Sequence, residues 1–178
     1  MSTVMVFNVS DTRGQEFEEL FHQHYRLVYR TACRVTGRAE DAEDVVQTLF
    51  LRLVRSGLPS GFSGNPKGYL YRATVNVALN VVRSRRRYVI TSGADRPDVP
   101  DETNSTSAES PIQDLLIEAI AHLDPGVVEM LVLRYEHDYS DAEIAKLLGK
   151  SRGVVAVTLY RARARLKKLL RASLGGRS

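Results

Sequence analysis

The feature that most constrains the fold is an acidic segment near the middle of the 178-residue chain. Residues 94–114 carry six acidic side chains against one arginine, with three prolines and several serines and threonines. This composition is typical of a solvated linker, because it offers little apolar surface to bury. A structureless connection of about twenty residues is rare inside one compact domain. The sequence therefore predicts two small domains, residues 15–87 and 112–172, joined by a flexible linker at 88–111, with tails at 1–14 and 173–178.

The composition predicts that both domains are all-α. Ala, Val, Leu, Arg and Glu dominate, aromatic residues make up 7% of the chain, and tryptophan is absent. The single cysteine, Cys33, cannot form an internal disulfide. The sequence has no apolar run of about 18 residues, and its first eight residues lack the basic start of a signal peptide. We therefore expect a cytoplasmic protein without a membrane span.

Positive charge is concentrated in two segments, although the whole chain carries only +4. Residues 150–178 hold nine basic side chains and no acid, and residues 67–87 hold six and no acid. Two basic faces on separately mobile domains favour a long polyanion as partner, of which nucleic acid is the commonest. A merely solvated basic face is the alternative.

Two amphipathic helices are predicted in the first domain. Apolar residues recur at helical spacing in 17–35, and the first helix ends at Gly37. The second, in 39–53, has an apolar stripe opposite a polar first half that contains Asp41, Asp44 and Gln47. Acids near a helix start can simply compensate the helix dipole. Because Asp44 and Gln47 lie a turn further in, a protein-docking face is an equally good interpretation.

A third helix is predicted over residues 67–87, after a loop rich in Gly and Pro. We expect its apolar side to be Leu70, Ala73, Val77 and Val81. Another side aligns amides and guanidinium groups, with an aromatic ring nearby: Asn76, Asn80, Arg83 and Arg87, beside Tyr69 and Arg72. Amides can bond to base edges, arginines bind phosphates and aromatic rings stack on bases, which is the chemistry that unpaired DNA requires. The alternative is a solvated face with the tyrosine packed on the core.

The second domain is predicted to contain a helix-turn-helix. A helix over 112–123 would face inward through Ile112, Leu115, Leu116, Ala119, Ile120 and Leu123. Asp124 and Pro125 then restart the chain as N-cap and first helical residue. Ser140 and Glu143 form a capping box, Gly149 ends that short helix, and Ser151 can cap the next one.

The second helix of such a motif enters the major groove of DNA by its N-terminal residues. Groove contacts are therefore expected from Arg152, Ala156, Thr158 and Tyr160. The later basic residues are candidates for phosphate contacts: Arg161, Arg163, Arg165, Lys167 and Lys168. A helix-turn-helix used only for packing is the alternative, which the acid-free basic helix disfavours.

Over nearly its whole length the chain resembles bacterial sigma factors of the extracytoplasmic-function type. The resemblance is carried by residues 41–47 with Phe50, by residues 76–83 with the arginines that follow, and by residues 139–166. It implies sigma region 2 in the first domain and region 4 in the second. It also implies core RNA polymerase and promoter DNA as partners, admits an anti-sigma factor as a further partner, and involves no cofactor.

The resemblance also implies roles for particular residues. By this resemblance, the helix that contains Asp41, Asp44 and Gln47 would dock on the largest polymerase subunit. The residues that would open and bind the minus-ten element are Tyr69, Asn76, Asn80, Arg83 and Arg87. Those that would read the minus-thirty-five element are Ser151, Arg152, Ala156, Thr158, Tyr160, Arg161 and Arg165.

The sequence leaves two other classes of protein as alternatives. A helix-turn-helix repressor or activator that binds duplex DNA as a dimer is the main alternative, against which the acidic helix and the Asn–Arg stripe argue. An enzyme is disfavoured, because the four histidines form no recognisable triad or metal motif and no phosphate-binding glycine loop is present. We therefore expect neither catalytic residues nor a metal site.

Overall fold

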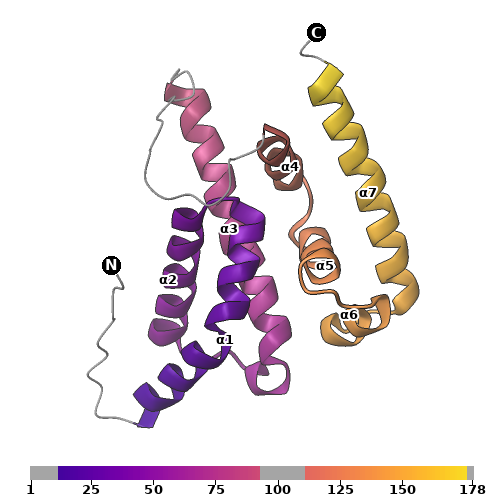
Figure 1. The fold of residues 1–178 in the computed structure, drawn as a ribbon. Helices are drawn as coiled ribbons and strands as arrows, with labels where there is room; N and C mark the ends of the chain where they lie inside the picture. The colour runs from indigo at the N-terminus through magenta and orange to yellow at the C-terminus, as the bar shows by residue number, and fades with distance from the viewer. Residues whose placement is uncertain (1–11, 93–110, 176–178) are drawn as a thin grey trace.

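The computed structural model describes residues 12–92 and 111–175, and within these ranges its regular elements are all helical. The first half contains α1 (Thr12–Thr36), α2 (Ala39–Ser56), the 3₁₀ helix η1 (Phe62–Gly64) and α3 (Pro66–Ser92). The second half contains α4 (Pro111–Ala121), α5 (Pro125–Tyr135), α6 (Asp141–Leu148) and α7 (Arg152–Gly175). The all-α fold predicted from the sequence is thereby confirmed (Figure 1).

Helices α1, α2 and α3 form a three-helix bundle. Its core contains most of the stripe predicted on the first two helices, with aromatic contacts such as Phe21 against Phe50, whose ring centroids lie 4.8 Å apart. The buried core residues are Leu20, Val28, Val46, Leu49, Phe50, Leu53, Phe62 and Leu70. Helical spacing was sufficient to predict this core, because α1 and α2 each bury a single stripe.

The buried face of α3 differs from the predicted one. Of the four expected residues, only Leu70 is fully buried, and Ala73, Val77 and Val81 are partly exposed. The side chains that are buried instead are Tyr71, Thr74, Val75, Ala78, Leu79 and Val82. The physical reason is that α3 contacts α1 and α2 on one side and α4 and α5 on another, so it buries a wider arc than a surface helix.

Helix α4 follows the prediction only in part. Ala119 and Leu123 are buried as expected, and Leu115, Leu116 and Ile120 are partly buried. Ile112, however, is 61% exposed, whereas Ile117 and Ala121, which were not predicted, are buried together with Val82 of α3. Because α4 packs on both α3 and α7, its contacts rather than its own apolar pattern select the buried side chains.

The two halves of the chain share one hydrophobic core. A single cluster joins buried residues of α1, α2 and α3 to buried residues of α5, α6 and α7. The sequence predicted two domains but not this contact between them, and the halves are not separate in this structure. Helix α3 continues to Ser92, five residues past its predicted end, and α4 begins at Pro111, so most of the predicted linker lies outside the described residues. Among the described helices, none is long and apolar enough to cross a membrane.

Candidate nucleic-acid interface

Helices α6 and α7 form the predicted helix-turn-helix. The Ser140 hydroxyl accepts from the Glu143 backbone N–H (3.3 Å), and the Glu143 carboxylate accepts from the Ser140 backbone N–H (2.8 Å). These bonds to Ser140 hold the pKa of Glu143 below its ordinary value. Gly149 turns the chain with φ of 64°, and the Ser151 hydroxyl accepts from the Val154 N–H at 3.3 Å. Local hydrogen bonds thus set both ends of the turn.

The outer face of α7 is exposed and partly apolar. Val155, Leu159 and Ala162 anchor the opposite face in the core. Of the predicted groove contacts, Arg152, Ala156 and Tyr160 are exposed, whereas Thr158 is partly buried. The sequence reasoning missed Val154 and Val157, which are 50% and 49% exposed. Their place opposite the buried stripe could have identified them, and their methyl groups suit the apolar edge of thymine.

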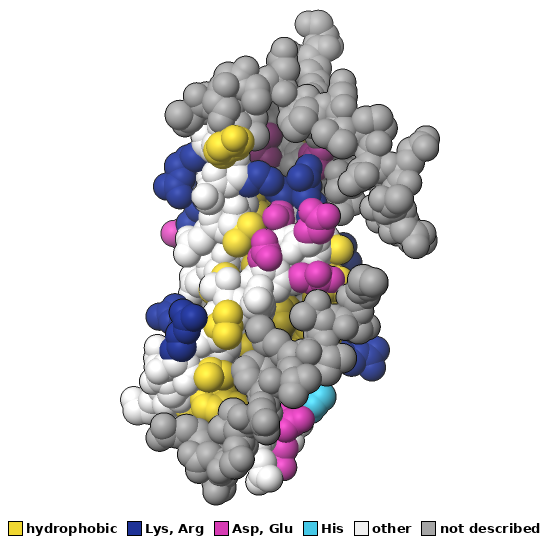
Figure 2. Space-filling model, turned by 90° about the vertical axis from the view of Figure 1, so that its left-hand side faces the viewer, with side chains coloured by type: hydrophobic (Ala, Val, Ile, Leu, Met, Phe, Trp, Pro, Cys, Tyr) yellow, Lys and Arg dark blue, Asp and Glu magenta, His cyan; other side chains and the backbone are white. Residues whose placement is uncertain are grey.

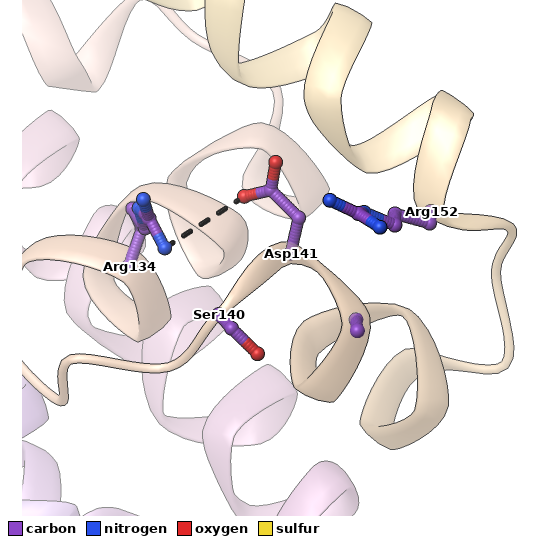
Figure 3. A pocket seen from close by; sticks show the side chains of 5 residues that line it. Arg134, Ser140, Asp141 and Arg152 are labelled. Carbon is purple, nitrogen blue, oxygen red and sulfur yellow. Dashed lines mark ion pairs between the residues drawn. The ribbon is translucent and has the colours of Figure 1, made fainter.

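Arg152 does not project from the outermost face of α7. It points across a shallow cavity of about 320 Å³ toward Asp141, as Figure 3 shows. On the other side of that carboxylate lies Arg134 of α5, whose Nη1 is 3.9 Å from Asp141 Oδ1 and donates to Tyr139 O at 3.1 Å. Arg152 and Asp141 therefore line the same cavity, and the ion pair of Asp141 is with Arg134.

The later basic residues of α7 are exposed, as expected of phosphate contacts. They are Arg161, Arg163, Arg165, Lys167 and Lys168. One of them has a partner within the chain: Arg165 Nη2 donates to the His122 carbonyl at 3.1 Å.

The stripe predicted on α3 is only partly displayed. Arg72, Asn76 and Asn80 are exposed in succession along one face of the helix, and Arg87 is exposed beyond them. Arg83, however, turns to α4: its Nε donates to Ala121 O at 3.0 Å and its Nη2 to Leu123 O at 3.1 Å. The amides of Asn76 and Asn80 therefore lie on one exposed face, whereas the Arg83 guanidinium is hydrogen-bonded to the backbone of residues 121 and 123.

Tyr69 packs against the bundle. Its ring meets Phe62 edge to face, with centroids 5.4 Å apart, and it borders the core of the first half. This is the packed alternative that the sequence left open.

Helix α2 presents a row of polar side chains to solvent, and Figure 2 shows acidic groups gathered on the face of the molecule that carries it. Glu40, Glu43, Asp44 and Gln47 are exposed. Asp41 is not part of this free surface, because its carboxylate is 21% exposed and pairs with Arg85 of α3.

The sequence reasoning did not assign a role to Glu129 of α5. This carboxyl is 3% exposed, and its Oε2 lies 3.7 Å from Arg72 Nε on α3. The other oxygen, Oε1, has no hydrogen-bond partner. Burial raises the pKa of Glu129 to about 7, although the charges of Arg72 and Lys150 oppose that shift. No sequence pattern indicates such burial, because it results from the contact between the two halves.

Within the described residues, His, Cys, Asp and Glu side chains form no group of three or more that could hold a metal ion. His137 lies instead beside Thr31, with 3.1 Å between Nε2 and Oγ1.

Two protein families match this chain, in the order of its two halves. Residues 20–88 match sigma-70 region 2, and residues 113–166 match sigma-70 region 4. Together the matches cover more than half of the sequence.

Two relatives are similar along most of this chain. The ECF RNA polymerase sigma factor SigE of Mycolicibacterium smegmatis is 30% identical over 164 residues, which is 86% of this chain and 61% of that protein. The ECF RNA polymerase sigma factor SigM of Mycobacterium tuberculosis is 29% identical over 154 residues, which is 86% of this chain and 76% of that protein. The chain thus spans less than two thirds of SigE.

Two solved structures share the fold. One is the sigma factor RpoE in complex with the anti-sigma factor NepR from Bartonella quintana, with a TM-score of 0.52, 21% identity, and coverage of 88% of this chain and 98% of that one. The other is CnrH in complex with the cytosolic domain of CnrY, with a TM-score of 0.50, 23% identity, and coverage of 92% and 91%.

Proposed function

Because the chain belongs to the extracytoplasmic-function (ECF) group of sigma-70 factors, we propose that it binds core RNA polymerase and directs promoter recognition, DNA melting and transcription initiation. The observation that carries this proposal is the presence of two different DNA-suited faces in one chain. An exposed row of Arg72, Asn76 and Asn80 lies on α3, and a basic helix-turn-helix lies in α6 and α7. A duplex-binding repressor needs only the second face.

Docking on polymerase is assigned to the exposed polar side of α2. Asp44 and Gln47 lie beyond the first turn, where charge adds little to helix-dipole compensation, and both side chains are exposed. Asp41 is omitted from this surface, since Arg85 holds it.

Capture of the melted minus-ten strand is assigned to α3. The amides of Asn76 and Asn80 can donate to and accept from the edge of an unpaired base, while Arg83 and Arg87 bind the backbone. Flipping a base out of the stack costs a few kcal/mol, which such hydrogen bonds must return.

Recognition of the duplex minus-thirty-five element is assigned to α7. Arg161 and Arg165 serve as phosphate contacts, and the exposed side chains of Ala156, Val157 and Tyr160 face the groove. Arg152, which is exposed near the start of α7, is assigned to the groove with them.

The remaining partners follow from the same proposal. An anti-sigma factor is a further partner, which the complex of RpoE with the anti-sigma factor NepR supports. Transcription places the chain in the cytoplasm, and in this role the polymerase, not the sigma factor, performs the catalysis.

The test is reconstitution with bacterial core polymerase, read out as run-off transcription from a promoter library. We expect the parent chain to direct initiation. The variant Asp44→Lys should bind core polymerase at least about tenfold more weakly, because it reverses a charge at the docking face. Glu19→Lys, on the exposed side of α1, makes the same charge change away from that face and should bind like the parent.

Two outcomes of this experiment would contradict the proposal. Core binding by Asp44→Lys equal to that of the parent would contradict the docking assignment. Absence of run-off products together with palindromic DNA protection by a dimer would replace the sigma factor with a repressor.

A further inference from the structure

Helix α7 begins with a run of side chains that can neither donate nor accept a hydrogen bond. Residues 153–157 are Gly, Val, Val, Ala and Val. Val155 is fully buried in the core, and the other four are exposed, Val154 and Val157 by 50% and 49%. The start of the second helix is the part of a helix-turn-helix that reads base edges. In this chain that part offers an apolar surface.

The polar side chains nearest to this run are engaged or point elsewhere. The Ser151 hydroxyl accepts from the Val154 backbone N–H at 3.3 Å, and Thr158 is partly buried. Arg152 points across the cavity toward Asp141 (Figure 3). These side chains therefore leave the outermost face at the start of α7 to the valines.

Val154 and Val157 project from this face, about one helical turn apart. Each residue advances about 100° around a helix, so Val157 lies about 200° from the buried Val155. The neighbouring Gly153 and Ala156 carry almost no side chain, and a Cβ at Gly153 would have no atom within 4 Å. Such small residues let a helix backbone come close to a ligand. The two valine side chains can therefore reach the base edges inside a groove.

Charge identifies the partner that this apolar face fits. Residues 150–178 hold nine basic side chains and no acid. A second copy of the chain on this face would bring two acid-free helices together, which their like charges oppose. The major groove of duplex DNA instead offers phosphates to the basic residues. To the valines it offers the 5-methyl group of thymine, the apolar group among its base edges.

We propose that Val154 and Val157 read thymine methyl groups, so that α7 recognises its duplex element at these positions by apolar contact rather than by hydrogen bonds. This inference rests on the proposed function for the placement of α7 in the major groove. Three residues rise about 4.5 Å along a helix and base pairs stack about 3.4 Å apart, so the two thymines lie one or two base pairs from each other. Each contact removes about one methyl group from water, which corresponds to about a fourfold change in affinity.

The first experiment compares duplexes with and without this methyl group. Two libraries share a random 20-base-pair core, and a flanking tag marks one as made with thymidine and the other with deoxyuridine. Deoxyuridine keeps the base-pair hydrogen bonds and lacks only the 5-methyl group. The full-length chain, alone and bound to core polymerase, selects from an equimolar mixture. We expect the thymidine library to dominate the bound fraction, with thymine enriched at two positions one or two base pairs apart.

The second experiment assigns this preference to the two valines. On the selected duplex, replacing either thymine by uracil should weaken binding of the parent about fourfold, measured by fluorescence anisotropy. Val157→Ala should lose this effect at one thymine and Val154→Ala at the other. The matched control is Val54→Ala, at a valine of α2 that is 42% exposed, and it should keep both effects. Alanine is a better helix former than valine, so neither change in α7 weakens the helix.

Salt dependence separates these contacts from phosphate contacts. A methyl contact releases no counterion, so Val154→Ala and Val157→Ala should keep the parent's slope of log affinity against log salt. Arg161→Ala, at a residue assigned above to a phosphate, should flatten that slope by about 0.9. It should also keep the parent's ratio of affinities for the thymine and uracil duplexes.

Equal capture of the two libraries, or a uracil effect that both valine variants retain, would overturn this inference. Self-association of the parent that Val157→Ala abolishes in sedimentation velocity would overturn it in favour of a second copy of the chain. Methyl preference without run-off transcription would overturn only the proposed function. Run-off transcription with equal capture of the two libraries would overturn only the methyl contacts.

Discussion

At the scale of single residues, Glu129 combines burial with an unpaired polar atom. It is almost completely buried, one oxygen lacks a hydrogen bond, and the nearest cation, Arg72, lies 3.7 Å away. An ionised carboxylate at this buried position would lose its hydration. The attraction to Arg72 compensates for only part of that loss in free energy. Its pKa accordingly rises from 4.5 to about 7.

This shift makes stability depend on pH. Between about pH 4.5 and pH 7 the folded chain holds a proton on Glu129 that the unfolded chain has lost, so the contribution of this residue to stability falls as pH rises through that range. Glu129→Gln keeps the shape and removes the titration. We expect it to raise the free energy of unfolding by about 1–3 kcal/mol at pH 8 and to change it little at pH 4.5.

Urea unfolding of the parent and the variant from pH 4.5 to pH 8 measures this difference. Glu19→Gln, an exposed control, should show the pH profile of the parent. A parallel profile for Glu129→Gln would mean that Glu129 is ionised in the folded chain at neutral pH.

At the scale of elements, the end of α1 determines how closely α4 approaches. Gly37 ends that helix with φ of +75°, and its N–H donates to the Cys33 carbonyl at 2.9 Å. A Cβ at Gly37 would overlap Ile117 Cδ1 of α4. Gly57, which ends α2, has nearly the same φ of +74° but no atom within 4 Å of such a Cβ. Both positions favour glycine through the backbone, and only the first also needs it for packing.

The two glycines can be compared. Gly57→Ala should cost about 1–3 kcal/mol, because φ of 74° with ψ of 171° is a backbone conformation that almost only glycine adopts. Gly37→Ala should cost more, because it adds a steric conflict with buried Ile117. Urea unfolding of both variants gives the comparison, and equal losses would show that α4 adjusts without cost or is not packed there in solution.

At the scale of the whole molecule, the shared core predicts cooperative behaviour. The larger core cluster includes Val75 and Leu79 of α3 together with Val128 and Leu133 of α5, so neither half can unfold without exposing the apolar surface of the other. We therefore expect the free chain, with its halves packed together, to unfold in one cooperative transition.

Native-state hydrogen exchange checks this expectation. Core amides of α2 and of α7 should exchange through openings of the same free energy, because both report global unfolding. Arg34 Nε of α1 donates to the Glu136 carboxylate, just after α5, at 2.6 Å, so in Arg34→Ala the two values should move apart as the halves become less coupled. Different values in the parent chain would indicate that the halves are independent domains, as the sequence by itself suggested.

The sequence by itself determined what depends on neighbours within one or two helical turns. The Ser140–Glu143 capping box, the turn at Gly149, the apolar stripe of α2 and the basic outer face of α7 all require only residues close in the chain. Their hydrogen bonds and periodicity are local, so residue type and spacing suffice to predict them. The assignment to sigma regions came from a family resemblance that these local motifs carry, whereas the domain boundaries and the site roles stay predictions.

The tertiary structure decided what depends on partners distant in sequence. Arg83 and Arg165 had the same sequence signal as Arg161, yet these two donate to backbone carbonyls of residues 121–123, at and just after the end of α4. Asp41 shares the acidic pattern of Asp44 but pairs with Arg85 on α3. In each case the deciding term is an unsatisfied backbone or charged group that packing brings within hydrogen-bond distance. Spacing along one helix carries no information about the partner that another helix supplies.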